Sequence, residues 1–326
     1  MIRIHNDRVD VGTSTFAGNF PGQNDEWDLE KFKQTFKITM HNMTDVSANF
    51  DLSGCDTSFA NALRRIMIAE VPCVAIEKVF IEMNTGVMHD EILAQRLGLI
   101  PINMPPDMLE WVPASEDDQT PLYTEHNCVT FTLNVQCTKN PNAARDETDP
   151  DKLYINSKVY AKDLVYVPME AHQDWPVKPS VLSPDILLTK LRPGQEISLT
   201  AYAILGIGSD HAKFSPVATA SYRMMPSITI TNEIDPEHVE KFQKCFPPGV
   251  IGIKDGQPFV ADARKDTVSR EVLRHPEFQD KVVLGRIRDH FIFNVESTGA
   301  MEPDEIFVKS IAILRNKAQE LLDCEF

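Results

Sequence analysis

The stretch Asp56-Thr-Ser-Phe-Ala-Asn-Ala-Leu-Arg-Arg65 is the most informative part of this sequence, and Val71-Pro72 follows it. Its beginning is typical of a helix N-terminus, because the Asp56 carboxylate can accept hydrogen bonds from amide groups of the first turn. Apolar residues then recur at helical spacing, at Phe59, Ala62, Leu63, Ile66 and Met67. Since proline disfavours helical conformation at the preceding residue, the pattern predicts a helix over residues 57–70.

Strands and short helices are expected on both sides of this helix. A second helix over residues 91–97 begins after Asp90 and ends at Gly98, and a third is expected near residues 267–274. Alternating or β-branched runs predict strands over residues 33–38, 47–52, 74–82, 129–135, 159–167, 196–205, 218–230 and 290–296.

The C-terminal region predicts a long helix. Pro303 suits the first helical position, and the acidic residues that follow favour the positive end of the helix dipole. The helix is expected to run to about residue 323. Its apolar stripe is wide, and Val308 and Ile313 lie outside it. Such excess apolar surface indicates contact with a partner helix. A sheet of the same chain could bury this surface equally well.

Composition excludes several classes of protein. The chain of 326 residues carries 32 Lys and Arg against 48 Asp and Glu, a net charge of −16. A primary role as a nucleic-acid clamp is disfavoured, because phosphate binding needs a basic surface. The six scattered cysteines fit a reducing compartment. No apolar run approaches the roughly 18 residues of a membrane span, so we expect a nuclear or cytosolic protein.

Motifs of enzymes are few. Gly206-x-Gly208 lacks the third glycine and the following helix of a dinucleotide site, and we interpret it as a strand end or turn. The adjacent Asp210-His211 pair could be the catalytic fragment of a hydrolase. An isolated histidine is more often structural or solvated, however, and this is the favoured interpretation here.

An acidic loop over residues 140–151 contains a second candidate. Asp149 and Asp151 form a carboxylate pair on either side of a proline. A solvated loop is the expected structure, and a weak cation site is the alternative.

Several separated motifs resemble the alpha-type subunits of RNA polymerases. The helix Asp56–Arg65 with its Asn-x-Leu-Arg-Arg pattern resembles the alpha motif, and Phe214-Ser-Pro-Val217 resembles the return strand that follows it. Phe293-Asn-Val-Glu-Ser-Thr-Gly299 and Met301-Glu-Pro-Asp-Glu-Ile306 resemble the late strand, turn and final dimerisation helix. The resemblance covers nearly the whole chain from about residue 26.

Further motifs narrow the resemblance to the larger alpha-like subunits, of about 40 kDa, that RNA polymerases I and III share. Leu93–Pro101 resembles the eukaryotic and archaeal alpha-like subunits in general. The motifs that resemble the subunit shared by polymerases I and III are Leu191–Ser198, His211–Pro216, Cys245–Gly249 and Ala263–Leu273. The competing family is the third-largest subunit of RNA polymerase II, which carries a cysteine cluster in its inserted domain. Here that region holds only Cys128 and Cys137, which cannot complete a tetrahedral metal site, so neither a metal nor another cofactor is expected.

The resemblance implies an α+β fold. An extended N-terminal arm is expected over residues 1–29. A discontinuous alpha-type dimerisation domain is expected over residues 30–83 and 216–326, and an inserted, β-rich domain interrupts it over residues 84–215.

The resemblance also implies a non-catalytic assembly role in the transcription of rRNA, tRNA and 5S rRNA, in the nucleus and its nucleolus. The chain would pair with the smaller alpha-like subunit, and the pair would form a platform for the second-largest and largest subunits and for small zinc-binding subunits. Neither a membrane nor direct contact with nucleic acid is expected. The expected heterodimer contacts are Phe59, Leu63, Ile66, Met67, Ile306, Phe307, Ile311, Leu314, Ala318 and Leu321.

By the same resemblance Asn61, Arg64 and Arg65 would face the second-largest subunit instead of the alpha-like partner. Two alternatives stay open. One is a hydrolase that uses Asp210 and His211, which would be stable as a monomer or homo-oligomer. The other is a free transcription or chromatin interaction module, which would associate with polymerase only in part.

Overall fold

The computed structural model describes residues 2–4, 9–10, 27–113, 123–144 and 147–324. The chain divides into two compact units. Unit 1 consists of Met1–Met43, Ala48–Ala62 and Ser221–Asn294, and unit 2 consists of Thr44–Ser47, Leu63–Ala220 and Val295–Phe326.

Five elements have residues in both units: β3 (Lys37–Thr44), β4 (Ser47–Ser53), α2 (Thr57–Ala69), β15 (Val217–Ile230) and β18 (Val282–Ser297). The predicted boundaries of the dimerisation domain and the inserted domain therefore stay predictions. Of the predicted N-terminal arm, residues 1, 5–8 and 11–26 lie outside the described part of the chain.

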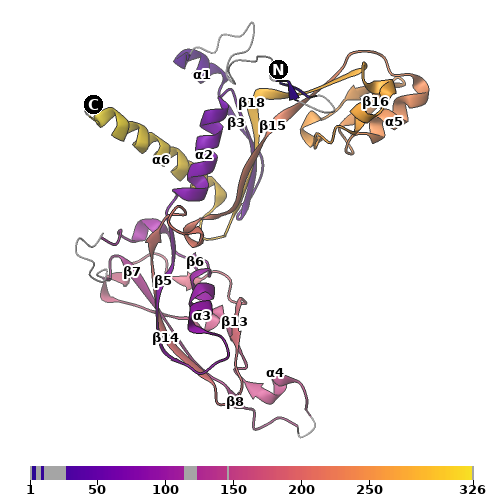
Figure 1. Cartoon of the computed structure of the whole chain (residues 1–326). Helices are drawn as coiled ribbons and strands as arrows, with labels where there is room; N and C mark the ends of the chain where they lie inside the picture. Colours follow the sequence, from indigo (N-terminus) through magenta and orange to yellow (C-terminus); the bar gives the residue numbers. More distant parts are fainter. Residues whose placement is uncertain (1, 5–8, 11–26, 114–122, 145–146, 325–326) are drawn as a thin grey trace. The chain divides into compact units, whose positions relative to one another are not determined.

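A sheet built from distant segments forms the centre of unit 1 (Figure 1). Besides β15 and β18, it contains β1 (Ile2–Ile4), β2 (Val9–Asp10), β3 (Lys37–Thr44) and β4 (Ser47–Ser53). The strand order is β2-β1-β18-β4-β3, and β15 pairs with β18 as well. Long strands were thus expected correctly at residues 47–52, 218–230 and 290–296.

The two faces of this sheet differ in chemistry because side chains alternate along each strand. On one face Phe50 of β4 stacks on Phe293 of β18, with ring centroids 5.2 Å apart and nearly parallel planes. Tyr222 of β15 contacts both Phe291 and Phe293. This face is the apolar one, whereas Asp51, the neighbour of Phe50, lies on the other.

The second face carries a buried polar cluster around Asp51. Its Oδ2 lies 3.1 Å from His41 Nε2 of β3 and 3.0 Å from His290 Nε2 of β18. The Arg264 guanidinium donates to Oδ1 over 3.0 Å and also contacts Asn49. Burial raises the pKa of Asp51, but the hydrogen bonds from Arg264, His290 and His41 outweigh it and leave the pKa below its ordinary value.

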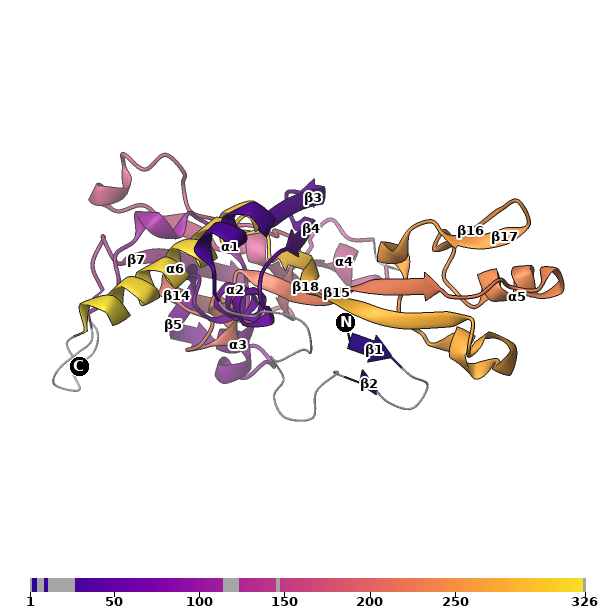
Figure 2. The same cartoon turned by 90° about the horizontal axis from the view of Figure 1, so that it is seen from above.

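A lobe between β15 and β18 has a small core of its own. It contains α5 (Val239–Lys244) and the hairpin of β16 (Ile251–Lys254) with β17 (Gln257–Val260). Figure 2 shows α5 and this hairpin beside each other, next to the ends of β15 and β18. The core includes Phe242, Val250, Val272 and Phe278, all nearly or fully buried.

The helix predicted near residues 267–274 forms only in part. The structure has a short 3-10 helix over Glu271–Arg274, and Val268 and Arg270 before it adopt the left-handed backbone conformation, with φ of 57° and 62°. An α-helix cannot continue through such residues.

The strand predicted over residues 33–38 is also wrong in its first half. Helix α1 spans Leu29–Thr35, and β3 begins only at Lys37. The Asp28 side chain caps α1 by accepting from the Glu30 backbone N–H over 2.9 Å. Gly54 permits the close approach of α1, since a Cβ at this position would lie 2.2 Å from the Thr35 carbonyl oxygen.

A second sheet is the centre of unit 2. Its strands are β5 (Cys73–Asn84), β7 (Cys128–Gln136), β11 (Val165–Val167) and β14 (Glu196–Gly206), in the order β11-β7-β14-β5. Small paired strands surround it: β6 (Ile102–Asn103) with β12 (Ser180–Val181), β8 (Thr138–Lys139) with β9 (Tyr154–Ile155), and β10 (Lys158–Tyr160) with β13 (Leu187–Lys190). The strand predicted over residues 159–167 is therefore split between β10 and β11.

The helices of unit 2 are α3 (Asp90–Gly98), the short α4 (Pro150–Leu153) and α6 (Pro303–Asp323). Helix α3 lies beside β5 and β13 (Figure 1). Its buried residues Leu93 and Leu97 join the inward residues of β7 and β14 in one core. Every second residue of β14 from Ile197 to Leu205 is buried, as its alternation predicts.

The glycines interpreted as a strand end and turn have that role. Gly206 is the last residue of β14, and Gly208 lies in the turn after it. A Cβ on Gly208 would lie 2.2 Å from the carbonyl oxygen of Ile68 in the last turn of α2. Only glycine permits this approach, so the motif serves packing at this position.

Candidate protein interface

Helix α6 is anchored in unit 2 by its first two turns. Ile306 and Ser310 are fully buried, and the Ser310 hydroxyl donates to the Phe307 carbonyl oxygen over 2.6 Å. Lys309 Nζ lies 2.7 Å from an Asp107 carboxylate oxygen. One further contact is made later in the helix, where Lys317 Nζ lies 2.8 Å from both carboxylate oxygens of Glu70.

The rest of α6 exposes apolar side chains. Ile311 is 40% exposed and Leu321 is 63% exposed, and both lie on the stripe predicted from the sequence. Leu314 is half-buried and Ala318 is exposed. These residues recur at alternating spacings of three and four, which aligns them on one side of the helix as in a coiled-coil seam. We call Ile311, Leu314, Ala318 and Leu321 the α6 stripe.

Helix α2 begins as predicted. The Asp56 carboxylate accepts from the Ser58 backbone N–H over 2.8 Å, and hydrogen bonds from Ser58 hold the pKa of Asp56 below its ordinary value. Leu63, Ile66 and Met67, however, are at most 3% exposed within the chain itself.

This burial corrects the predicted interface. Leu63, Ile66, Met67 and the α6 residue Ile306 expose almost no surface to a partner, so the proposed contact excludes them. Phe59 and Phe307 are half-buried and stay in it. Helical spacing identifies the apolar face of a helix but does not say whether that face covers the chain's own core or a partner.

The chain matches the RNA polymerase Rpb3/Rpb11 dimerisation domain family over residues 49–318. The chain belongs to this family. The match includes α2, β5, β7, β14, β15, β18 and most of α6. It begins after α1 and β3 and ends before Leu321.

Similar proteins cover nearly the full chain. The DNA-directed RNA polymerases I and III subunit RPAC1 of Saccharomyces cerevisiae is 55% identical over 99% of this chain and 98% of its own length. The protein of the same name from Homo sapiens is 43% identical over 96% of this chain and 91% of its own length. The DNA-directed RNA polymerase subunit Rpo3 of Methanothermobacter thermautotrophicus is 32% identical over 88% of this chain and 98% of its own length.

The arginine pair of α2 lies within the family match. Arg65 is exposed and forms no ion pair with any other residue in the described ranges, whereas Arg64 and Asn61 are half-buried. An exposed guanidinium without a carboxylate keeps all its donors available for a bidentate contact. Contact of this group with a large polymerase subunit stays a prediction, and Arg65 is its most accessible member.

The residues considered for catalysis and cation binding have structural partners. His211 Nδ1 accepts from the Lys213 backbone N–H over 3.1 Å and so caps a 3-10 helix over Ala212–Phe214. Asp149 caps α4 by accepting from the Asp151 backbone N–H, and Asp151 pairs with Lys158. Within the described part of the chain, no group of three acidic, His or Cys side chains is placed to hold a metal ion.

The cysteines divide into two kinds. Cys55, Cys73, Cys128, Cys137 and Cys245 are buried, and Cys324, which follows α6, is exposed. Burial raises the pKa of the Cys128 thiol to about 11 and also raises that of Cys137. Both stay protonated at neutral pH, and a protonated thiol is a poor metal ligand.

Sequence reasoning missed an aromatic cluster on α1. Trp27 lies 5.2 Å from Phe32 between ring centroids, and Phe32 and Phe36 both contact Phe59 of α2. Trp27 is 71% exposed. The signal was the spacing of Phe32 and Phe36 after the capping residue Asp28, which is helical rather than alternating.

Membrane insertion through a helix finds no support in the structure. Over the residues it describes, no helix combines the length and the apolar character that spanning a bilayer requires.

Proposed function

We propose that this chain is a non-catalytic assembly subunit shared by DNA-directed RNA polymerases I and III. Membership of the dimerisation family and the names of the similar proteins support this function. The chemistry of nucleotide addition belongs to other subunits. The location that follows is the nucleus, and for a polymerase I subunit the nucleolus within it.

The observation that carries the proposal is the α6 stripe. A helix that leaves several large apolar side chains in water loses the free energy of their burial, about 1.5–3 kcal/mol for each Leu or Ile. Leu322, beside the stripe, is 78% exposed, and Val308 is 63% exposed. Contiguous apolar surface of this kind marks a protein contact.

The proposed occupant of the α6 stripe is the smaller alpha-like subunit. Phe59 and Phe307 are further proposed contacts of this partner. Arg65, with Arg64 and Asn61 beside it on α2, is the proposed contact for the second-largest subunit. The resulting pair is the platform on which the largest subunit and the small zinc-binding subunits assemble.

Purification of the tagged chain from its native cell at high salt tests this function. We expect equimolar recovery of a small alpha-like subunit together with the largest subunits of both polymerases I and III. Recovery with polymerase II subunits would place the chain in the sister group. Recovery in sub-stoichiometric amounts would favour a free interaction module, and recovery as an isolated monomer would contradict the assembly role.

Charge reversal at Arg65 is expected to separate the two proposed contacts. Arg65→Glu should leave the heterodimer intact, because Arg65 is not part of the α6 stripe. It should weaken capture of the second-largest subunit by the preformed heterodimer at least tenfold, since truncating a charge pair in an interface costs about 2–5 kcal/mol. The affinity is measured by titrating the purified large subunit against the immobilised heterodimer.

The matched control is Lys254→Glu, which reverses the charge of an exposed residue on β16. It should leave both contacts unchanged. Loss of the heterodimer in Arg65→Glu would instead show that this arginine belongs to the fold or to the dimer contact.

A further inference from the structure

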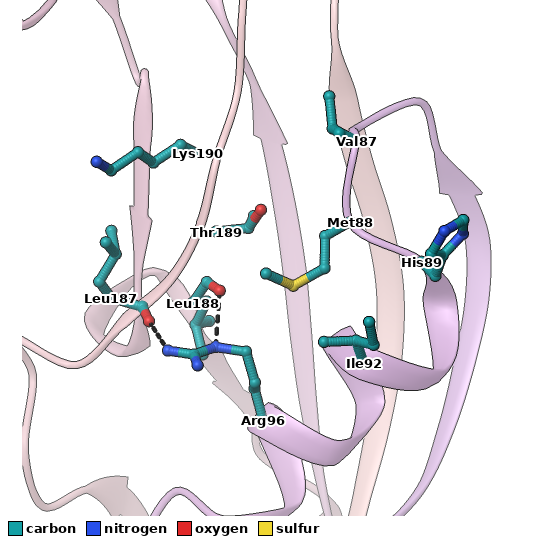
Figure 3. Close-up of a pocket in the computed structure, with 9 residues that line it drawn as sticks. All are labelled: Val87, Met88, His89, Ile92, Arg96, Leu187, Leu188, Thr189 and Lys190. Carbon is teal, nitrogen blue, oxygen red and sulfur yellow. Dashed lines mark hydrogen bonds between the residues drawn. The ribbon is translucent and has the colours of Figure 1, made fainter.

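A groove in unit 2 lies between α3 and β13. Figure 3 shows its two walls, with Met88 and Ile92 on one side and the residues of β13 on the other. The cavity has a volume of about 540 Å³, and its lining is mostly apolar. Val87 at its rim is 81% exposed and Ile92 is 47% exposed. None of these residues belongs to the α6 stripe or to the arginine pair.

One wall of the groove is a free strand edge. Strand β13 pairs with β10 on one side, where Thr189 lies opposite Val159. The Leu191 N–H donates to the Ser157 carbonyl oxygen over 2.8 Å on the β10 side, and backbone groups alternate between the two edges of a strand, so those of Lys190 are directed to the other side. Arg96 from α3 donates to the carbonyl oxygens of Leu187 and Leu188 over 2.5 and 3.0 Å (Figure 3).

Arg96 therefore satisfies the carbonyl groups of Leu187 and Leu188, and the edge stays open at Lys190. Outside the β10–β13 pair, the backbone N–H and C=O of Lys190 have no hydrogen-bond partner among the described residues. An edge with unpaired backbone groups is a template for another extended segment. A helix cannot use such an edge, because its own backbone groups are already paired.

The charge at the rim is basic on the strand side. Lys190 is exposed and forms no ion pair with any residue that the structure describes. The Arg96 guanidinium lies at the other end of the same edge and has no carboxylate partner in the structure's described ranges. In a chain of net charge −16, a local pair of cations beside an apolar groove favours an acidic ligand.

We propose that this groove binds an extended acidic peptide segment of a partner protein, which adds as a strand to β13. The segment pairs its backbone with Lys190, places one apolar side chain between Met88, Ile92 and Leu188, and directs a carboxylate at the Lys190 ammonium. Backbone pairing supplies affinity, and the apolar pocket and the charge supply specificity, as in other cases of strand addition. This site is independent of the proposed heterodimer.

Peptide titration of the full-length chain tests the proposal. The probe is a synthetic ten-residue peptide of Ser and Thr with a central leucine flanked by two aspartates. A second peptide replaces the aspartates by lysines, and a third carries an N-methyl group on the leucine to remove its N–H. Binding is followed through the methyl NMR signals of Met88 and Ile92.

We expect the aspartate peptide to shift these signals and to bind at least tenfold more tightly than either of the other two. Equal binding of the three peptides would overturn the strand-addition geometry. Absence of any shift at Met88 and Ile92 at millimolar peptide would overturn the site.

Two variants make the test specific to the groove. Lys190→Glu should invert the preference, so that the lysine peptide binds more tightly than the aspartate peptide. Ile92→Asp should weaken binding at least tenfold. The control Ile253→Asp changes a similarly exposed isoleucine, 44% against 47%, on β16 in unit 1 and should have no effect. A preference that Lys190→Glu leaves unchanged would contradict the assigned charge contact.

Discussion

Ile311→Asp is expected to abolish the heterodimer with the smaller alpha-like subunit. The substitution removes an apolar side chain from the α6 stripe and places a carboxylate in a contact that excludes water. The lost burial is worth about 1.5–3 kcal/mol, and an unpaired charge in a desolvated contact adds a penalty of several kcal/mol. Together these effects raise the dissociation constant of the heterodimer at least thousandfold, since each 1.4 kcal/mol is a factor of ten.

The measurement is co-expression of both chains followed by size-exclusion chromatography and titration of the separately purified subunits. Ala312→Asp is the matched control. It introduces the same charge at an exposed position one residue further along, on the far side of the helix from the stripe. Wild-type affinity in Ile311→Asp, or an equal loss in both variants, would contradict the α6 stripe as the interface.

Position 311 is chosen over positions on α2 for a structural reason. Leu63 is 0% exposed, so a charge at this position would disrupt the core and unfold the chain whether or not a partner binds there. Ile311 is 40% exposed and can accept an aspartate in the unbound chain. Only an exposed residue separates loss of binding from loss of folding.

Asp51→Asn is expected to destabilise unit 1 by about 3 kcal/mol. The substitution removes the charge that Arg264, His41 and His290 share, and breaking a buried ion pair by removing one partner costs about 3–5 kcal/mol. The lower end of this range of costs applies because the Arg264 side chain is 24% exposed. Hydrogen exchange of the β4 and β18 amides in the full chain should become about a hundredfold faster.

Asp289→Asn is the control, because it changes an exposed aspartate on β18 next to the cluster. Its effect should stay within about 0.5 kcal/mol, as for most surface substitutions. Unchanged exchange in Asp51→Asn would show that the cluster contributes nothing to the sheet.

We also expect the stability difference between wild type and Asp51→Asn to depend on pH. The pKa of Asp51 in the folded chain lies below its ordinary value of 3.8. Its charge therefore stabilises the folded state fully above about pH 4, and this contribution is lost as the pH falls through the folded pKa. The difference in stability between wild type and Asp51→Asn should therefore shrink as the pH falls below about 4.

The elements that the sequence predicted well have strong local signals. Helix α2 has a capping aspartate and a terminating proline, and α6 begins at Pro303, so capping chemistry and periodicity agree for both. The backbone at residues 268 and 270 was not predictable, because neither Val nor Arg favours the left-handed conformation that surrounding packing imposes. Helix α1 was predicted wrongly because its seven residues are too few to show a clear helical period.

The candidate site was predictable only in outline. Helical spacing identified the apolar residues of the α6 stripe, which are exposed or half-buried, and their place in an interface stays a prediction. The same reasoning placed Leu63, Ile66 and Met67 in the interface, where the structure shows core residues. Burial by residues distant in sequence leaves no local signature, so a periodic stripe cannot distinguish the two cases. The groove between α3 and β13 depends on chain segments about a hundred residues apart and was invisible to local patterns.

The difference in exposure among the cysteines allows the chain to be labelled at a single site. Five thiols are buried, and burial raises the pKa of Cys55 to about 12, which keeps it unreactive. Cys324 alone among the six is exposed, three residues beyond Leu321 of the α6 stripe. A maleimide dye therefore labels the native, unmutated chain at one place, beside the proposed contact, and its fluorescence follows partner docking in real time.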